Sequence, residues 1–171
     1  MDGDVRRSAI GTGLFTVLVP CTVAGVAPYY LIASNAQLFR FGTDLSRAAG
    51  LIAIACGALI YAWCAFDFVT AGHGTPSPTH PPRALVVRGL YRFSRNPMYV
   101  GVSSVVFGEA LYFGSGNQLV YALCVLAGFH ARVVFGEERA LRRAFGAEYV
   151  AYCTRVPRWI GRVKKGGSDG D

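Results

Sequence analysis

Residues 48–66 have the sequence AAGLIAIACGALIYAWCAF and contain no charged side chain. A helix needs about 20 predominantly apolar residues to cross the roughly 30 Å hydrocarbon core of a bilayer. The stretch therefore predicts a membrane span over residues 48–69. Asp67 lies near its end, where a carboxylate at the membrane surface is tolerated.

Two further windows with almost no charge flank this span. Residues 8–39 carry none and predict a span over residues 10–33, bent by its two prolines. Between residues 96 and 131 the only charge is Glu109, and this window is too long for one crossing. A Gly-Ser-Gly-Asn turn signal at residues 114–117 divides it into short spans over residues 97–113 and 118–135. We therefore expect four spans, and leave open a fifth element that is reentrant or interfacial.

The composition agrees with a polytopic membrane protein. Of the 171 residues, 53% are apolar and 16% are charged, whereas soluble globular domains carry about 25% charged residues. The mean hydropathy is +0.36. These values argue against a disordered chain, a coiled coil or an ordinary cytosolic enzyme.

The placement of the basic residues predicts the orientation. Seventeen Lys and Arg against ten Asp and Glu give a net charge of +7, which on a soluble protein would suggest nucleic acid. Here fifteen of the seventeen fall on one side of the predicted spans, and only Arg40 and Arg47 fall on the other. By the positive-inside rule, we expect a multi-pass protein of a bacterial inner membrane with both termini cytoplasmic and no nucleic-acid partner. A cleavable signal peptide is not expected, because the first apolar stretch is too long.

The predicted fold is an all-α membrane bundle of about four spans with a C-terminal amphipathic cytoplasmic helix. Residues 1–70 are expected to form a two-span scaffold, and residues 71–96 a Pro-rich and then basic connection. Residues 97–160 are expected to form a second hairpin with the C-terminal helix, and residues 161–171 a disordered tail. His73 and His80 in the connection have no Cys or carboxylate at ligand spacing, so no metal site is predicted. The cysteines form no C-x-x-C pair and are expected to be buried.

Chemistry-bearing residues gather in the second half of the chain. Asn96 before Pro97 predicts a helix start, because Asn can cap free N–H groups and Pro is preorganised at the first helical position. This helix end would lie among four arginines and could hold an anionic group, or form a basic collar for lipid headgroups. Glu137 and Glu138 follow the last span, and a stripe with helical spacing comes after them, at Leu141, Phe145, Tyr149, Tyr152 and Val156.

In this order, the motifs resemble the isoprenylcysteine carboxyl methyltransferase family, to which the phospholipid N-methyltransferases are related. The resemblance covers residues 67–159 and rests on GLYR at 89–92, RNPMYVG at 95–101, the glutamate pair and FGAEYVAY at 145–152. It implies an S-adenosylmethionine-dependent integral membrane methyltransferase. The common family pattern has His where this chain has Asn96, so any acid–base role of that His is absent here.

The resemblance and the chemistry of S-adenosylmethionine together predict a cofactor site. Arg95 and the helix start would hold the carboxylate of the cofactor, and the two glutamates would accept hydrogen bonds from its ribose or ammonium. Tyrosines would pack on the adenine or face the sulfonium. The predicted cofactor residues are Tyr91, Arg95, Asn96, Pro97, Tyr99, Gly101, Glu137, Glu138, Tyr149 and Tyr152. No catalytic residue is assigned.

The acceptor and some roles stay open. The expected partners are the lipid bilayer and a lipidic or small-molecule methyl acceptor carrying a carboxylate, amine or thiol. The C-terminal pattern also resembles the end of the longer NADPH-dependent membrane sterol reductases, and a non-catalytic scaffold of the same fold is a third hypothesis. Glu109 and His130 are expected at similar depth on facing helices, either paired as buried structure or lining the acceptor pocket.

Overall fold

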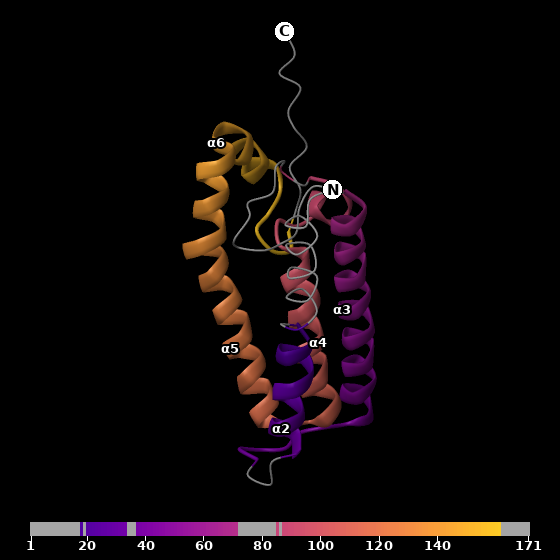
Figure 1. The fold of residues 1–171 in the computed structure, drawn as a ribbon. Helices are drawn as coiled ribbons and strands as arrows, with labels where there is room; N and C mark the ends of the chain where they lie inside the picture. The colour runs from indigo at the N-terminus through magenta and orange to yellow at the C-terminus, as the bar shows by residue number, and fades with distance from the viewer. Residues whose placement is uncertain (1–17, 19, 34–36, 72–84, 86, 162–171) are drawn as a thin grey trace, which may run out of the picture.

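The computed structural model describes residues 18, 20–33, 37–71, 85 and 87–161, and every regular element in this part of the chain is helical (Figure 1). The elements are the π-helix η1 (Thr22–Val26), α2 (Ala27–Ala33), α3 (Asp44–Ala71), the 3₁₀-helix η2 (Gly89–Arg92), α4 (Pro97–Phe113), α5 (Gly116–Arg132), the π-helix η3 (Val133–Glu137) and α6 (Glu138–Arg155). The predicted all-α class is confirmed. The Pro-rich linker with His73 and His80, residues 162–171 of the predicted tail and the start of the first expected span lie outside the described residues.

The helices form an elongated bundle in which α3 and α5 lie on opposite sides of α4, and α6 turns over one end (Figure 1). A small core cluster of Val102, Val106 and Ala122 joins α4 to α5, and Val23 and Ala24 of η1 pack against it. The hydroxyl of Tyr121 donates to the backbone carbonyl of Val23 over 2.9 Å. These contacts seat the first helical segment against the α4–α5 hairpin.

Paired glycines bring α3 and α4 very close together. A Cβ on Gly57 would lie 2.5 Å from the carbonyl oxygen of Gly101, and a Cβ on Gly50 would lie 2.6 Å from that of Gly108. Real Cβ atoms do not approach backbone atoms this closely, so only glycine fits at these positions. In a bilayer there is little hydrophobic drive between helices, and close backbone contact through small residues is a main source of association.

The turn expected at residues 114–117 is present and divides α4 from α5. Gly114 has a φ of 60°, in the left-handed region that favours glycine, and Ser115 caps α5 by accepting from the N–H of Gln118. The N–H of Phe41 donates to the Gly114 carbonyl over 2.9 Å, and that of Gly116 donates to the Phe39 carbonyl over 3.0 Å. This end of the hairpin is therefore tied to the segment before α3.

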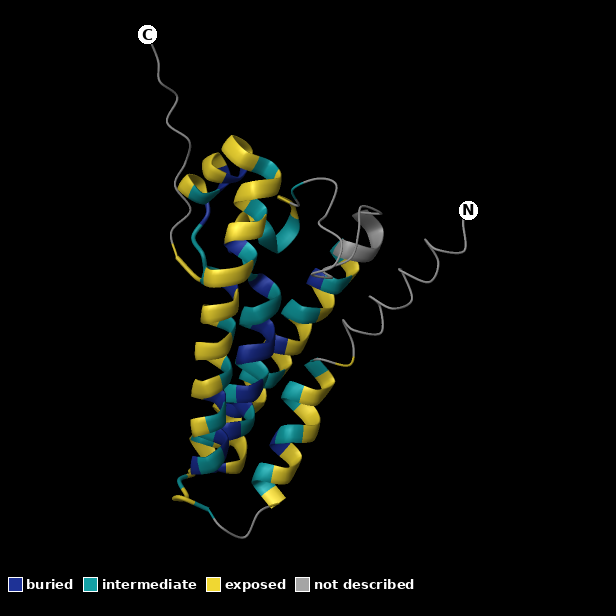
Figure 2. Cartoon of the chain, turned by 60° about the vertical axis from the view of Figure 1, so that its left-hand side comes forward, coloured by how far each residue is buried: buried dark blue, intermediate teal, exposed yellow. Residues whose placement is uncertain are grey.

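The outer surfaces of the long helices are apolar. Two helices of the described part are long and apolar enough to cross a membrane, Asp44–Asp67 and the continuous helix Gly116–Arg155. In the most apolar 18-residue stretch of each helix, only 17% of the first and 11% of the second is buried. Exposed side chains such as Leu59 of α3 at 70% and Leu123 of α5 at 53% lie on these faces, and exposed residues run along the outside of the bundle (Figure 2). Since water would not stabilise such surfaces, the chain is an integral membrane protein with helical spans.

Two expectations for the interior of the bundle were wrong. Glu109 lies near the C-terminus of α4 and accepts from the side-chain amide of Gln118 over 2.9 Å, whereas His130 lies near the C-terminus of the antiparallel α5. His130 stacks on Trp159 and accepts from its indole N–H over 3.3 Å. The two residues are therefore at different depths and do not pair. Of the cysteines only Cys64 is buried, while Cys21, Cys56 and Cys124 lie on exposed faces.

Candidate functional site

A carboxylate shared by two arginines lies where α6 covers the end of α4. Glu138 Oε1 accepts from Arg95 Nη1 over 2.9 Å and from Arg158 Nε over 2.7 Å, and Oε2 accepts from Arg158 Nη2 over 3.0 Å. The side chains of Arg95 and Glu138 are 11% and 9% exposed. Because both oxygens of Glu138 are engaged, this residue joins three separate segments of the chain.

The π-helix η3 determines where the two glutamates point. The N–H of Glu138 donates to the Val133 carbonyl, which is the i→i−5 pattern of a π turn. Glu137 therefore turns toward α4 and α5, where Tyr99 donates to its Oε1 and Arg132 Nε approaches the same atom at 3.0 Å. Within the described residues, Glu137 Oε2 accepts no hydrogen bond. Adjacent carboxylates thus have separate surroundings, and the one on Glu137 keeps an open oxygen.

The C-terminal segment after α6 is fixed to the start of α4. The N–H of Arg95 donates to the Pro157 carbonyl over 3.0 Å, and the side-chain amide of Asn96 donates to the Arg158 carbonyl over 3.0 Å. Asn96 and Pro97 begin α4 as predicted, but the Asn96 side chain does not cap the helix. Its amide binds the returning C-terminal segment instead.

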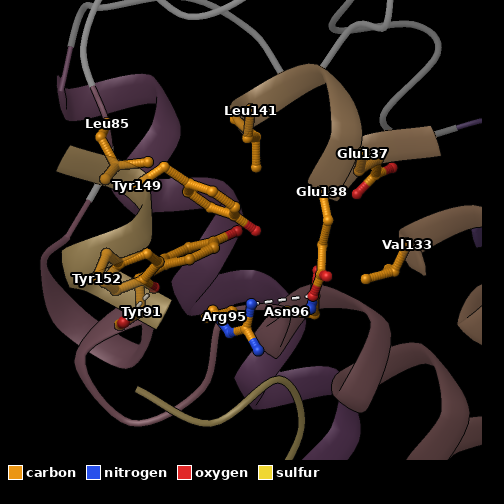
Figure 3. A pocket seen from close by; sticks show the side chains of 10 residues that line it. All are labelled: Leu85, Tyr91, Arg95, Asn96, Val133, Glu137, Glu138, Leu141, Tyr149 and Tyr152. Atoms are coloured by element: carbon orange, nitrogen blue, oxygen red, sulfur yellow. Dashed lines mark hydrogen bonds and ion pairs between the residues drawn. The ribbon is translucent and has the colours of Figure 1, made fainter. Parts of the chain in front are cut away.

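A cavity of about 100 Å³ lies between these groups and the tyrosines of α6 (Figure 3). Arg95 and Glu138 form one side, and the rings of Tyr149 and Tyr152 form another. The complete lining is Leu85, Tyr91, Arg95, Asn96, Val133, Glu137, Glu138, Leu141, Tyr149 and Tyr152. Typical small-molecule pockets measure roughly 300–1,000 Å³, so a ligand of nucleoside size must also use space beyond this cavity.

Seven of the ten predicted site residues line the cavity, and three do not. Tyr99 lies next to it through its bond to Glu137, and Pro97 is buried at the first position of α4. Gly101 faces α3, where its ideal Cβ would lie 2.8 Å from the Gly57 carbonyl oxygen.

The sequence prediction also left out residues that the structure brings to the site. Arg132 contacts Glu137, and Arg158 contacts Glu138. A basic residue near a glutamate pair is the signal that could have identified Arg132. Arg158 lies twenty residues after its partner, and its contact depends on the turn of the chain after α6.

The tyrosines of α6 are held as neutral phenols. Tyr149 and Tyr152 are only 2% and 4% exposed, and the hydroxyl of Tyr152 donates to the Tyr91 carbonyl over 2.6 Å. Burial raises the pKa of Tyr149 to about 12 and also raises the pKa of Tyr152. Their rings therefore offer apolar and π surface to the cavity rather than charge.

The carboxyl of Glu138 is held in its charged form. Burial by itself would raise its pKa, but the hydrogen bond from Arg158 and the charges of Arg95 and Arg158 outweigh burial and lower it. Glu138 lies beyond residue 135, where we place the end of the last span. At neutral pH the cluster therefore carries one negative charge between two positive ones.

Arg95 retains a donor that the protein does not use. Its Nε is buried and has no hydrogen-bond partner among the described residues. Buried donors without a partner are costly, and a ligand group is one way to satisfy them. A guanidinium donor, an open carboxylate oxygen on Glu137 and two aromatic faces fit a ligand that combines an anionic group, a cationic or hydroxyl group and a flat ring.

Comparisons with known proteins agree on one family. A family model described as phospholipid methyltransferase matches residues 45–148. Over 91 residues the chain is 32% identical to the protein-S-isoprenylcysteine O-methyltransferase of Saccharomyces cerevisiae, covering 51% of this chain and 38% of that protein. Over 130 residues it is 32% identical to the Rattus norvegicus protein of the same name, covering 68% of this chain and 42% of that protein. The chain thus spans about two fifths of the length of these relatives. No solved structure matches significantly.

Proposed function

Since the chain belongs to the phospholipid methyltransferase family, we propose that it transfers a methyl group from S-adenosylmethionine to an acceptor at the cytoplasmic surface of the membrane. The family match supports methyl transfer over an NADPH-dependent reductase or a non-catalytic scaffold. The structural observation that carries the proposal is that Arg95, whose buried Nε has no partner among the described residues, lines a cavity together with two tyrosine rings and Glu137.

We assign different roles to the two glutamates and to Arg95. Arg95 binds the carboxylate of the cofactor through its unpaired Nε, and Glu137 accepts from the ammonium or a ribose hydroxyl through Oε2. Glu138 does not contact the ligand in this proposal, since both of its oxygens hold arginines. It positions Arg95 instead.

The remaining residues supply shape and exclude water. When bound, S-adenosylmethionine supplies an electrophilic methyl group on a sulfonium. Tyr149 and Tyr152 offer aromatic faces for the adenine or the cationic centre, and Leu141 and Val133 add apolar walls. Transfer of the methyl group to a nucleophile requires mainly that the reacting atoms are aligned. In this proposal Arg95 contributes to catalysis by holding the cofactor in a fixed orientation.

The acceptor in this proposal is amphipathic or small and approaches from the bilayer. Both curated relatives are named for methylation of protein S-isoprenylcysteine, which joins a polar group to a lipid chain. Exposed apolar side chains lie close in sequence to the site residues, at Phe93, Phe135 and Ile160. A lipidic acceptor would keep its chain in the membrane and its carboxylate, amine or thiol at the surface.

The cofactor site can be tested by calorimetric titration of the purified full chain with S-adenosylmethionine. Arg95→Ala and Glu137→Gln should each weaken binding about ten- to a hundredfold, because a lost charged hydrogen bond is worth roughly 1.5–3 kcal/mol. Glu148→Gln, which changes an exposed glutamate of α6, should change affinity by less than about 1 kcal/mol.

Helicity and thermal unfolding must match the parent chain before the affinities are compared. Equal affinity in the parent chain and both site variants would refute the assignment of the site. Binding of NADPH with no binding of S-adenosylmethionine would refute methyl transfer.

We also propose four spans with both termini cytoplasmic, from the basic residues counted above. A reporter fused after Asp171 should give a cytoplasmic signal, and one inserted after Gly114, between α4 and α5, should give the opposite signal. An extracytoplasmic signal after Asp171 would overturn the orientation.

A further inference from the structure

The first half of α6 has two distinct faces. Glu138, Leu141 and Phe145 point inward, toward Arg95 and the cluster of buried tyrosines. Arg139, Arg142 and Arg143 are exposed on the outward face, at the helical spacing i, i+3 and i+4. Gly146, with a φ of 49° and a ψ of −121°, then kinks the helix, so these two turns form a separate short segment.

The outward face carries a strong positive charge, and Arg142 is close enough to Glu138 to lower the pKa of that carboxyl. Among the described residues, no carboxylate forms an ion pair with Arg139, Arg142 or Arg143. Phe135 adjoins them one turn earlier, with 63% of its surface exposed, and the Arg139 guanidinium lies over its ring at 5.6 Å from the centroid. The face thus combines three exposed guanidinium groups with an exposed aromatic ring.

The depth of this face follows from the length of α5. The helix from residue 116 to residue 135 has 20 residues, and at about 1.5 Å per residue it spans about 30 Å. That length equals the hydrocarbon thickness of a typical bilayer. If the turn before α5 lies at one membrane surface, Phe135 lies at the other, and the three arginines lie in the headgroup layer just beyond it.

From these observations we propose that Phe135, Arg139, Arg142 and Arg143 form a binding surface for the headgroups of anionic phospholipids at the cytoplasmic membrane surface. Guanidinium groups bind phosphate oxygens through paired hydrogen bonds, and the cytoplasmic leaflet is rich in negative charge. The phenylalanine ring enters the acyl region below. The bilayer therefore holds the outward face of the same two turns that carry Glu138 on their inward face.

The proposal is tested by titrating the detergent-solubilised full chain with short-chain phosphatidylglycerol and, separately, with short-chain phosphatidylcholine. We expect tighter binding of phosphatidylglycerol, weakened by added salt. The triple variant Arg139→Gln, Arg142→Gln, Arg143→Gln should lose on the order of a hundredfold in affinity, because each basic residue near an anionic surface contributes about a factor of five. The readout is lipid binding, so it is independent of methyl transfer.

Two further variants distinguish binding at this surface from a general effect of the protein's positive charge. Arg40→Gln with Arg47→Gln removes basic residues at the opposite end of the bundle and should leave phosphatidylglycerol binding unchanged. The triple Arg→Lys variant keeps the charge and should retain most of the binding, and it also serves if the Gln variant fails to fold. Equal affinity for the two lipids, an unchanged affinity in the Gln variant, or an equal loss in the Lys variant or in the opposite-end control would each overturn the proposal.

Discussion

Replacing Glu138 with Ala should lower the free energy of unfolding by about 3–5 kcal/mol, because removing one partner of a buried ion pair leaves an uncompensated buried charge. Here the loss is shared by two partners. Arg95, with its side chain 11% exposed, would lose its ion pair and keep the contact of Nη1 with Cys153 Sγ, and Arg158 would lose two hydrogen bonds. Denaturant unfolding of the purified chain in detergent, followed by circular dichroism, measures the change.

The matched control is Glu148→Ala, on the exposed side of the same helix, which should change stability by no more than about 0.5 kcal/mol. The pH dependence provides a second check. Because the folded-state pKa of Glu138 is lowered, its contribution is fully present above the unfolded-state pKa and is lost as pH falls through the folded value. A Glu138→Ala variant as stable as the Glu148→Ala control would show that the cluster does not hold these segments together.

Replacing both Gly50 and Gly57 with Ala should cost about 2–6 kcal/mol in total. Each new Cβ would meet a backbone atom of α4 at 2.5–2.6 Å, and forced overpacking costs about 1–3 kcal/mol per site. The two glycines are two helical turns apart, so their effects should add. Thermal unfolding of the double variant in detergent, compared with each single variant, measures both the size and the additivity of the effect.

Gly128→Ala is the control for helix propensity, since a Cβ there has nothing within 4 Å. It should be neutral or stabilise the protein by up to about 1 kcal/mol, because Ala is the better helix former. If the Gly50 and Gly57 variants were as stable as Gly128→Ala, the close approach of α3 and α4 would be wrong.

The sequence was most informative where one local signal decides the structure. The turn at residues 114–117 contains two glycines between apolar runs, and α4 and α5 end and begin beside it. The stripe along the C-terminal helix also predicted its buried face, since Tyr149, Tyr152 and Val156 form one cluster in the structure. In both cases a local signal, either the helical spacing of apolar residues or the glycines of a turn, determines the local backbone structure.

The sequence was least informative about which polar groups meet. Glu138 has an arginine four residues later, as an exposed helix would favour, yet its close partners are Arg95 and Arg158. Likewise Glu109 and His130 were expected at similar depth on facing helices, and each has a different partner in the structure. A charged residue in the bundle indicates that a partner is needed. Which residue becomes that partner depends on how segments far apart in the sequence come together.

The π turn at Val133–Glu137 affects how this chain is aligned with its relatives. A π turn accommodates one residue more than an α turn between the same flanking positions, so it is equivalent to a single inserted residue between Arg132 and Glu138. A relative with an unbroken α-helix here would need a one-residue gap in the alignment. Without that gap, Glu137 of this chain would be matched to the equivalent of Glu138, and the ligand contact proposed for Glu137 would be assigned to the residue that pairs with the two arginines. Residues on the two sides of η3 should therefore be matched separately, with α5 anchored at its capping Ser115 and α6 at its buried tyrosines.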